Sequence, residues 1–327
     1  MRSRIQRVCS KDLQSWVCRP MHHVPVLLKE VLEVMMPRDG GRYFDGTLGG
    51  GGHAQAILQE SSPSGQLAGT DLDSGTIAVL SDSLSCFGDR VHLYNANFSE
   101  IDRIRMILGW EYFDGILLDL GMSSWALDDA DRGFSFMREG PLDMRFSPQG
   151  DLDAYQVVNT YDENVLKDII KTYGEERFAP RIAKRIVQSR PLKTTSDLTD
   201  VVRAAVPKKF WPKKIHVATK TFQAIRMEVN KEIENLQRFL PKAYSSLSIG
   251  GVLAVISYHS LEDRIVKRFF SGTVGENYFL RGLPEPERVD APGLAKITGK
   301  SITASPEEIQ ANPRARSARL RAARRVR

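Results

Sequence analysis

The chain has 327 residues, of which 42% are hydrophobic and 26% are charged, which is ordinary for a globular protein and long enough for one domain with a sizeable insertion. No uninterrupted apolar run approaches the ~20 residues of a membrane-spanning helix, and three scattered cysteines argue against a disulfide framework and a zinc cluster. We therefore expect no membrane anchor and no structural metal. The net charge is +6, and the positive charge is concentrated at the C-terminus, where the last 14 residues contain seven arginines and no acid.

The first 20 residues are a basic extension with five positive charges and one negative charge. They lack the apolar core of a secretory signal. We expect residues 1–20 to be a disordered extension. An upstream start ahead of a true initiator at Met21, or a weak organelle-targeting segment, are the alternatives.

After residue 20 the sequence pattern alternates between predicted helices and predicted strands. Apolar residues between 24 and 36 recur with helical spacing and predict the first helix. Short apolar runs predict strands at 41–45, 67–71, 91–94 and 113–119. The last of these is apolar enough for a buried parallel strand, and such alternation calls for a parallel sheet covered on both faces.

After Ser124 the alternation stops, and residues from about 165 to 206 show only helical periodicity. A long helix marked by Ile225, Val229, Ile233 and Leu236 then leads into a strand at 251–258. The simplest explanation is an inserted helical domain of roughly 90 residues. We expect an α/β domain at 21–125 and 216–327, and an inserted all-helical domain at 126–215.

The glycine-rich turn after the first strand is the most informative segment. Asp45 ends the strand, Gly49–Gly52 follow, and His53 enters a helix. Glycines let the backbone turn sharply and let a ligand approach the main chain. A strand, turn and helix in this order place a nucleotide-bearing ligand at the carboxyl edge of the sheet. Asp71 ends the next strand, where a carboxylate can accept both ribose hydroxyls.

Three interpretations of this turn are open. The spacing of Gly49, Gly51 and Ala54 also fits the dinucleotide fingerprint of an NAD-dependent oxidoreductase. Asp45 argues against that interpretation, because negative charge is unfavourable beside a pyrophosphate but suits a cation such as the amino group of S-adenosylmethionine. A surface loop without any ligand is the third interpretation.

A series of motifs resembles one family from His23 to Ser317. The motifs are HVPVLL (23–28), DGT (45–47), GGH (51–53), DGILLDLG (114–121), RGFSFMREGPLDMR (132–145), TYGEER (172–177), TFQAIR (221–226), SLEDRIVK (260–267) and NPRARS (312–317). They are similar to the RsmH/MraW family, the methyltransferases that use S-adenosylmethionine to modify the N4 amine of a cytosine in the decoding region of 16S ribosomal RNA. The resemblance implies a Rossmann-like class I methyltransferase sheet with an inserted all-helical domain for substrate recognition.

The resemblance also implies a set of cofactor contacts. Besides Asp45, which we derive from its place beside the turn, they are Gly51, Gly52, His53, Asp71, Phe98, Asp119 and Ala126. Ala126 departs from the family, which usually has glutamine there, so only a backbone contact is possible at this position. Phe98 follows the third strand, where its ring can lie against adenine or can be an ordinary core aromatic.

For the chemistry we expect Asp119 to orient the target amine, whose lone pair is delocalised into the base. A carboxylate that only shapes a turn is the alternative. We expect an aromatic residue of the following loop, Trp125, Phe134 or Phe136, to stack on the base. His259 is a second candidate for substrate contact, although histidines at such positions are more often packing residues.

Contacts to RNA are expected from a local cluster that interleaves lysines with aromatic residues. Its members are Lys208, Lys209, Trp211, Lys213 and Lys214. The expected partner is 16S ribosomal RNA or the small ribosomal subunit, in the bacterial cytoplasm or, alternatively, an organelle matrix. A non-catalytic ribosome-assembly factor is the remaining alternative, and the oligomeric state is open.

Overall fold

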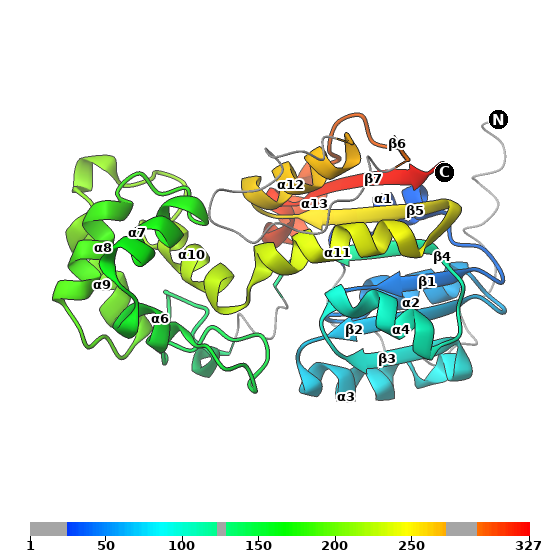
Figure 1. The fold of residues 1–327 in the computed structure, drawn as a ribbon, viewed down its shortest axis with the longest axis horizontal. Coiled ribbons are helices and arrows are strands. Elements are labelled where there is room, and N and C mark those ends of the chain that lie inside the picture. Colours follow the sequence, from blue (N-terminus) through cyan, green and yellow to red (C-terminus); the bar gives the residue numbers. More distant parts are fainter. Residues whose placement is uncertain (1–24, 123–128, 273–292) are drawn as a thin grey trace.

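A computed structural model describes residues 25–122, 129–272 and 293–327. The described residues form a seven-stranded sheet, which is drawn at the right of Figure 1. The strands are β1 (Arg42–Asp45), β2 (Gln66–Asp71), β3 (Val91–Asn95), β4 (Phe113–Asp119), β5 (Leu247–Ser257), β6 (Leu294–Lys296) and β7 (Arg319–Arg325). Their order is β3-β2-β1-β4-β5-β7-β6, parallel from β3 to β5, with β7 antiparallel to both neighbours. The chain adds β2 and β3 on one side of β1 and then returns to add β4 and β5 on its other side. The topological switch point of the sheet therefore lies at β1.

Helices cover both faces of this sheet. One face carries α4 (Ile101–Ile107), α11 (Glu232–Ser246) and α12 (Ser260–Phe270), and the other carries α1 (Leu28–Met35), α2 (Gly52–Glu60) and α3 (Ser74–Ser83). Successive residues of a strand point to opposite faces. Thus Phe44 packs on Phe113 in the core between the sheet and α4, α11 and α12. Its neighbour Tyr43 is buried on the other face, in the core between the sheet and α1, α2 and α3. Hydrophobic strands buried on both faces explain the continuous apolar runs of the sequence.

The inserted helices have a hydrophobic core of their own, drawn at the left of Figure 1. They are α6 (Ala154–Thr160), α7 (Glu163–Thr172), α8 (Ala179–Gln188), α9 (Thr195–Ala205) and α10 (Thr219–Val229). This core extends from Phe134 to Val229 and therefore includes α10. We propose that the junction between the two domains lies at the end of α10, beyond residue 215.

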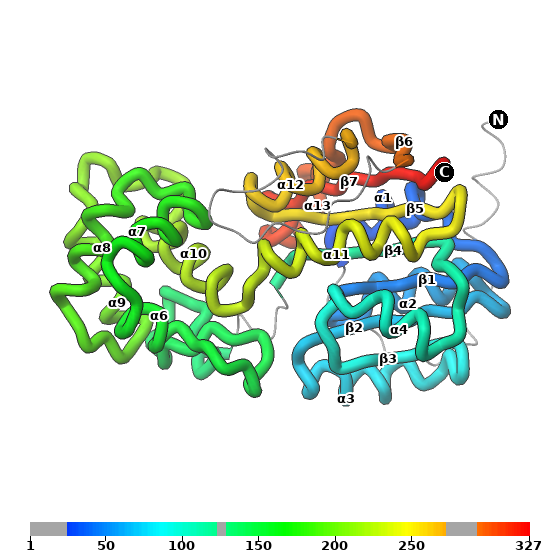
Figure 2. The backbone as a smooth tube through the Cα atoms, in the orientation of Figure 1, coloured from blue at the N-terminus to red at the C-terminus, as the bar shows by residue number. Residues whose placement is uncertain are grey.

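The long helix predicted through Ile225 and Leu236 is in fact two helices. The chain turns between α10 and α11, where Lys231 adopts a left-handed φ of 50° (Figure 2). Asn230 explains the break, because its side chain donates to the carbonyl oxygen of Met144 at 2.7 Å and accepts from the backbone N–H of Phe146 at 2.7 Å. A contact over more than 80 residues of sequence thus overrides the local helical pattern.

Three further observations concern expectations from composition. Cys86 is disulfide-bonded, which the odd and scattered set of cysteines did not predict. Within the described ranges, no helix has the length and apolar character needed to cross a membrane. The same ranges contain no group of three or more His, Cys, Asp or Glu side chains placed to hold a metal ion.

Candidate functional site

Three carboxylates meet at one edge of the sheet. Asp45, Asp71 and Asp119 are the last residues of β1, β2 and β4, and β1 lies between the other two strands. These strands are parallel, so their carboxyl ends lie at the same edge. This is the edge at which open α/β sheets bind their ligands.

Asp45 is a buried carboxylate with only one satisfied oxygen. Its Oδ1 accepts from the backbone N–H of Thr47 at 3.1 Å, whereas Oδ2 is buried and has no hydrogen-bond partner in the described structure. Burial raises its pKa well above the usual range, and the nearby charges of Asp119 and Asp71 act in the same direction. A buried acceptor without a partner is costly, so this atom is suited to a ligand that brings a cation or an N–H donor.

The glycine turn places open backbone beside this carboxylate. Gly51 has a φ of 78°, and a Cβ on Gly52 would lie 2.3 Å from Cγ of Pro25, so both positions require glycine. On the other side of the turn, a Cβ on Gly49 or Gly50 would meet no atom of the described residues within 4 Å. The turn is therefore closed toward Pro25 and open where a ligand can approach its main chain.

Asp71 is held at the rim of the turn. Its Oδ2 accepts from the backbone N–H of Gly49 at 3.0 Å, and its Oδ1 accepts from that of Asp73 at 2.9 Å. Each carboxylate oxygen has a further lone pair, so Asp71 can still accept two hydroxyl groups. Burial raises the pKa of Asp71, and the two backbone donors oppose that shift.

His53 is a neutral, buried residue of α2. Its Nε2 lies 3.0 Å from the carbonyl oxygen of Val26, which can only accept, so Nε2 carries the proton. Burial lowers the pKa of His53. Its other ring nitrogen, Nδ1, faces Oδ2 of Asp119 at 3.9 Å, beyond hydrogen-bonding distance.

Asp119 ends β4, the middle strand of the seven-stranded sheet. Its backbone N–H donates to Oγ1 of Thr47 at 2.7 Å, and its Oδ1 accepts from the backbone N–H of Gly121 at 3.0 Å. Burial raises the pKa of Asp119, and this shift is opposed by the backbone N–H of Gly121 and by the Tyr258 hydroxyl, which makes a polar contact with the carboxylate. Tyr258 follows directly after β5, the strand next to β4. The sequence analysis missed Tyr258, although its place at the end of a neighbouring strand was a usable signal.

Phe98 lies beside the same turn. A Cβ on Gly46 would approach Cβ of Phe98 to 3.0 Å, and the Phe98 ring packs edge-on against Phe239 with centroids 5.2 Å apart. The ring is partly buried at the border of the core. Phe98 can therefore complete the hydrophobic core and also cover a ligand bound at the turn.

An ion pair joins this edge to the segment that leads into the inserted domain. Nη1 of Arg132 donates to Oδ2 of Asp73 at 2.8 Å, and its Nη2 donates to the carbonyl oxygens of Arg145 and Phe146. Asp73 lies two residues after Asp71. No local pattern could predict this contact, because its partners are 59 positions apart.

The aromatic candidates for base stacking are differently placed. Phe134 is buried and stacks on Phe146 with centroids 5.5 Å apart, and Phe136 stacks on His216 at 4.9 Å. Both rings thus pack within the inserted domain in this conformation. Trp125, like the backbone contact expected at Ala126, lies outside the described residues.

His259 packs in a polar cluster beside the site. Its Nε2 lies 3.3 Å from Nη2 of Arg226. Burial, together with the charge of Arg226, lowers the pKa of His259 to about 3. The ring is therefore neutral near pH 7 and accepts a hydrogen bond.

The lysine cluster lies on the surface of the inserted domain. Lys208, Lys209, Lys213 and Lys214 are exposed. Trp211 anchors the segment, because its Nε1 donates to the carbonyl oxygen of Val206 at 2.9 Å and its ring packs against the inserted core.

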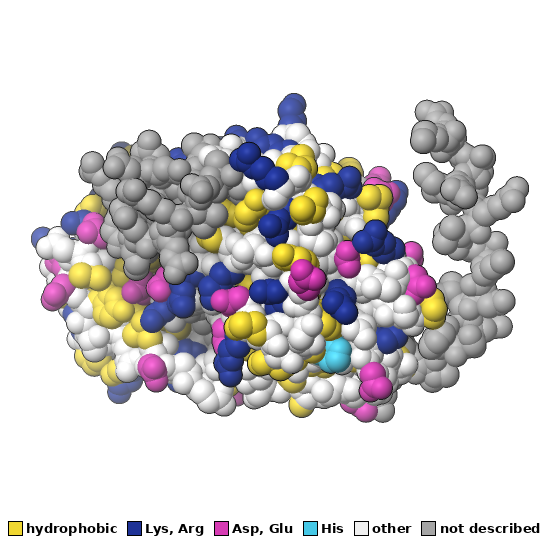
Figure 3. Space-filling model, turned by 45° about the vertical axis from the view of Figure 1, so that its right-hand side comes forward, with side chains coloured by type: hydrophobic (Ala, Val, Ile, Leu, Met, Phe, Trp, Pro, Cys, Tyr) yellow, Lys and Arg dark blue, Asp and Glu magenta, His cyan; other side chains and the backbone are white. Residues whose placement is uncertain are grey.

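Phe210 adds an exposed aromatic surface to the cluster. The ring lies under the guanidinium of Arg177 at 4.5 Å and near the Lys209 ammonium at 5.0 Å. On the face drawn in Figure 3, by contrast, positive and negative side chains are interspersed, so overall charge does not mark a single binding surface there.

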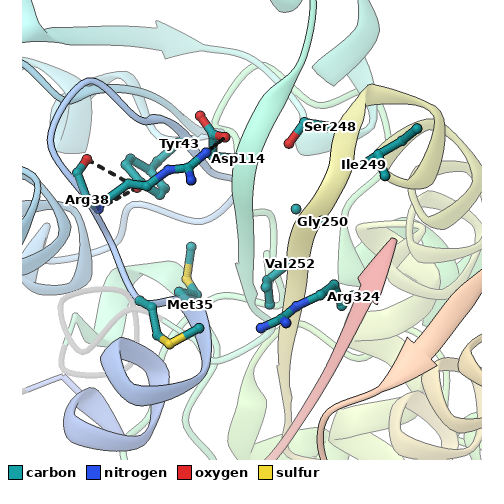
Figure 4. Close-up of a pocket in the computed structure, with 11 residues that line it drawn as sticks. Met35, Arg38, Tyr43, Asp114, Ser248, Ile249, Gly250, Val252 and Arg324 are labelled. Carbon is teal, nitrogen blue, oxygen red and sulfur yellow. Dashed lines mark hydrogen bonds and ion pairs between the residues drawn. The ribbon is translucent and has the colours of Figure 1, made fainter. Parts of the chain in front are cut away.

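A pocket of about 360 Å³ opens at the opposite edge of the sheet (Figure 4). It is lined by Arg38, Tyr43, Asp114, Ile249 and Arg324, at the amino ends of β1, β4 and β5 and the carboxyl end of antiparallel β7. Ligands of open α/β sheets bind at the carboxyl edge, so we assign no part of the site to this pocket.

Comparison with known proteins agrees with the geometry. Residues 20–326 match the MraW methylase family. Three similar proteins are each named Ribosomal RNA small subunit methyltransferase H. The one from Heliobacterium modesticaldum is 46% identical over 94% of this chain and 99% of its own length. Those from Dehalococcoides mccartyi and Geobacter sulfurreducens are 47% and 46% identical over 93% and 92% of this chain, and over 86% and 98% of their own lengths.

Proposed function

Since the chain belongs to the MraW methylase family, we propose that it methylates the exocyclic N4 amine of a cytosine in the decoding region of 16S ribosomal RNA. The enzyme is a methyltransferase that uses S-adenosylmethionine, and its sheet order with an antiparallel β7 confirms the class I fold expected from the resemblance. The similar proteins are named for small-subunit ribosomal RNA, which supports the substrate. The choice of cytosine N4 is what the resemblance of the motifs to the RsmH/MraW family implies. The family does not support the dinucleotide-dependent alternative.

The observation that carries this proposal is the unsatisfied Oδ2 of Asp45 beside an open glycine turn. The residues at this edge fit S-adenosylmethionine: Asp45 suits its amino group, Asp71 its ribose hydroxyls and Phe98 its adenine. The backbone of Gly51 and Gly52 and the ring of His53 complete the wall of the same site. When bound there, the donor supplies an electrophilic sulfonium methyl group.

Asp119 acts on the target amine. Its carboxylate accepts one N–H of the amine and orients the nitrogen lone pair toward the donor. Holding two reactants in line can contribute about 7–11 kcal/mol to a reaction, so alignment is the larger part of its role. The nitrogen becomes more acidic as it gains the methyl group, and it then releases one proton. The raised pKa of Asp119 makes its carboxylate a better acceptor for that proton than an exposed aspartate.

The inserted domain binds the RNA in this proposal. Exposed Lys208, Lys209, Lys213 and Lys214 contact phosphates, while Trp211 fixes the segment that carries them. The target cytosine must be unpaired or turned out of its stack to reach Asp119. Trp125 remains our candidate for stacking on it, and His259 shapes the adjoining wall as a neutral residue. For Phe134 or Phe136 to take that role, the ring would have to leave its present packing.

Mass spectrometry of small-subunit RNA tests this function. In bacterial cells that lack the gene, N4-methylcytidine should disappear from this RNA and return when the wild-type gene is supplied. A non-catalytic assembly factor would predict that the Asp119→Ala gene restores growth as well as the wild type. An unchanged level of N4-methylcytidine in the deletion strain would exclude the proposed reaction. We also propose a cytoplasmic location, because the similar proteins come from bacteria.

A further inference from the structure

Three motifs that contribute no donor contact meet at the junction between the inserted helices and the sheet. They are TYGEER, TFQAIR and SLEDRIVK, which lie at 172–177, 221–226 and 260–267. We propose that Glu175 and Arg226 are positioning residues for the methyl transfer, fixing the inserted domain against α12 and against the segment that follows β4. This inference rests on the proposed function, since it assumes that the inserted domain carries the substrate.

Glu175 reaches from the inserted domain to the first turn of α12. Its Oε1 accepts from Nη2 of Arg264 at 2.7 Å, and its Oε2 accepts from the hydroxyl of Ser260. The hydrogen bond from Ser260 and the charge of Arg264 lower the pKa of Glu175. The carboxylate is therefore ionised near pH 7 and bridges the two domains.

The loop that carries Glu175 has little freedom. Glu175 has a φ of 48°, an unfavourable conformation for a residue with a side chain. A Cβ on the preceding Gly174 would lie 2.6 Å from the carbonyl oxygen of Lys220. Nζ of Lys220 in turn donates to the carbonyl oxygen of Glu175 at 2.8 Å. Close packing on α10 thus maintains a strained backbone that directs Glu175 toward α12.

Arg226 makes the second, buried connection. Its Nε and Nη2 donate to the two carboxylate oxygens of Glu232 at 2.7 and 2.9 Å, which joins α10 to α11 across the break. Its Nη1 lies 2.7 Å from Sδ of Met122, and its Nη2 lies 3.3 Å from Nε2 of His259. One guanidinium therefore contacts the segments that follow both β4 and β5.

These segments adjoin the catalytic carboxylate. Met122 is three residues after Asp119, and His259 follows Tyr258, whose hydroxyl contacts Asp119. A rotation of the inserted domain would therefore be transmitted to the wall on which the target base must lie. Misplacement of reacting groups by about 1 Å can cost 10²-fold in rate, so rigidity at this junction matters for turnover more than for binding.

Charge reversal at Glu175 is the direct test. We expect Glu175→Arg to lower kcat by about tenfold or more while the Kd for S-adenosylmethionine and the KM for RNA stay unchanged. Adding Arg264→Glu should restore kcat, because the exchanged pair re-forms the ion pair. Glu33→Arg, an equal charge change on the exposed face of α1, is the matched control and should leave kcat unchanged.

Hydrogen–deuterium exchange tests the same inference without activity. In Glu175→Arg, amides at 173–178 and 258–264 should exchange faster, whereas those of β1 and β2 should not change. Arg226→Lys cannot form the two-pronged pair and should give the same pattern with a lower kcat. An unchanged kcat in Glu175→Arg, or no restoration by the double exchange, overturns the inference. If the wild type does not methylate small-subunit RNA, the proposed function is wrong. The hydrogen–deuterium exchange data would still decide, independently of activity, whether Glu175 fixes the junction.

Discussion

Nδ1 of His53 faces Oδ2 of Asp119 across a gap of 3.9 Å, without a hydrogen bond between them. Because burial keeps His53 neutral, Asp119 gains no fixed cationic partner from it. The carboxylate is held in place by the backbone N–H of Gly121 and by the Tyr258 hydroxyl, and it keeps capacity to accept from a substrate. This arrangement supports the proposal that Asp119 is the catalytic residue.

Replacement of Asp119 by Asn should therefore reduce kcat. The amide keeps the shape of the side chain but is a poor proton acceptor, and general base catalysis is worth about 10²–10⁴-fold. We expect a loss in this range in single-turnover assays with small-subunit RNA, with the protein folded as judged by circular dichroism. A variant that retains wild-type turnover would contradict the role of Asp119.

The pH dependence should follow the raised pKa of Asp119. The carboxylate form is required, so kcat should be constant at high pH and fall as pH decreases through a pKa above the ordinary aspartate range. Tyr258→Phe removes a contact that lowers this pKa. The acid limb of the kcat profile should therefore move to higher pH in Tyr258→Phe. A limb at the same pH, or at lower pH, would show that the hydroxyl does not act on Asp119.

Asp45→Asn should weaken donor binding and stabilise the protein without donor. Asn cannot supply the negative charge that faces the donor's amino group, so the Kd for S-adenosylmethionine measured by calorimetry should rise about tenfold or more. A tenfold change corresponds to about 1.4 kcal/mol of binding free energy. Asp114→Asn, at the opposite edge of the sheet, is the control. Equal Kd values for Asp45→Asn and the wild type would remove Asp45 from the donor site.

The sign of the stability effect follows from linkage. The pKa of Asp45 is raised on folding, so the folded protein holds this proton more tightly than the unfolded chain. Wild-type stability is therefore lost as pH rises from the unfolded pKa toward the folded pKa. Asp45→Asn should thus melt higher than the wild type at pH 8, and the difference should shrink at pH 4. A difference that grows at low pH would contradict the buried, unpaired carboxylate.

Lys213→Ala should weaken RNA binding in a salt-dependent way. A lysine that contacts one phosphate contributes about 1 to the slope of log K against log salt. The slope should fall by about that amount, while the Kd for the donor does not change. Lys29→Ala, an exposed lysine on α1, serves as the control. Identical slopes for the two variants would exclude Lys213 from the interface.

The sequence predicted the five parallel strands, and the edge at which three of them end in a carboxylate, because both depend on local patterns. Apolar runs that end in Asp45, Asp71 and Asp119 identify strands and their carboxyl ends together. Parallel pairing then brings the three carboxylates to one edge with no further information. The glycine turn is equally local, since the backbone conformation of Gly51 requires that residue type.

Contacts between distant segments could not be predicted in this way. Arg226 and Met122 are 104 positions apart, and no periodicity relates them. The break at Lys231 interrupts a pattern that is helical on both sides, because Asn230 binds a segment more than 80 residues earlier. The packing of Phe134 and Phe136 within the inserted domain also depends on which helices surround them.

Transfer of a labelled methyl group tests the central claim most directly. The purified protein is incubated with S-adenosylmethionine carrying a trideuterated methyl group and with small-subunit RNA from the deletion strain, and the nucleosides are analysed by mass spectrometry. We predict labelled N4-methylcytidine from one site in the decoding region with the wild type, and a strongly reduced amount with Asp119→Asn. Absence of label from cytidine N4, or label at another nucleoside, would contradict the assignment of this edge of the sheet as the site of cytosine methylation.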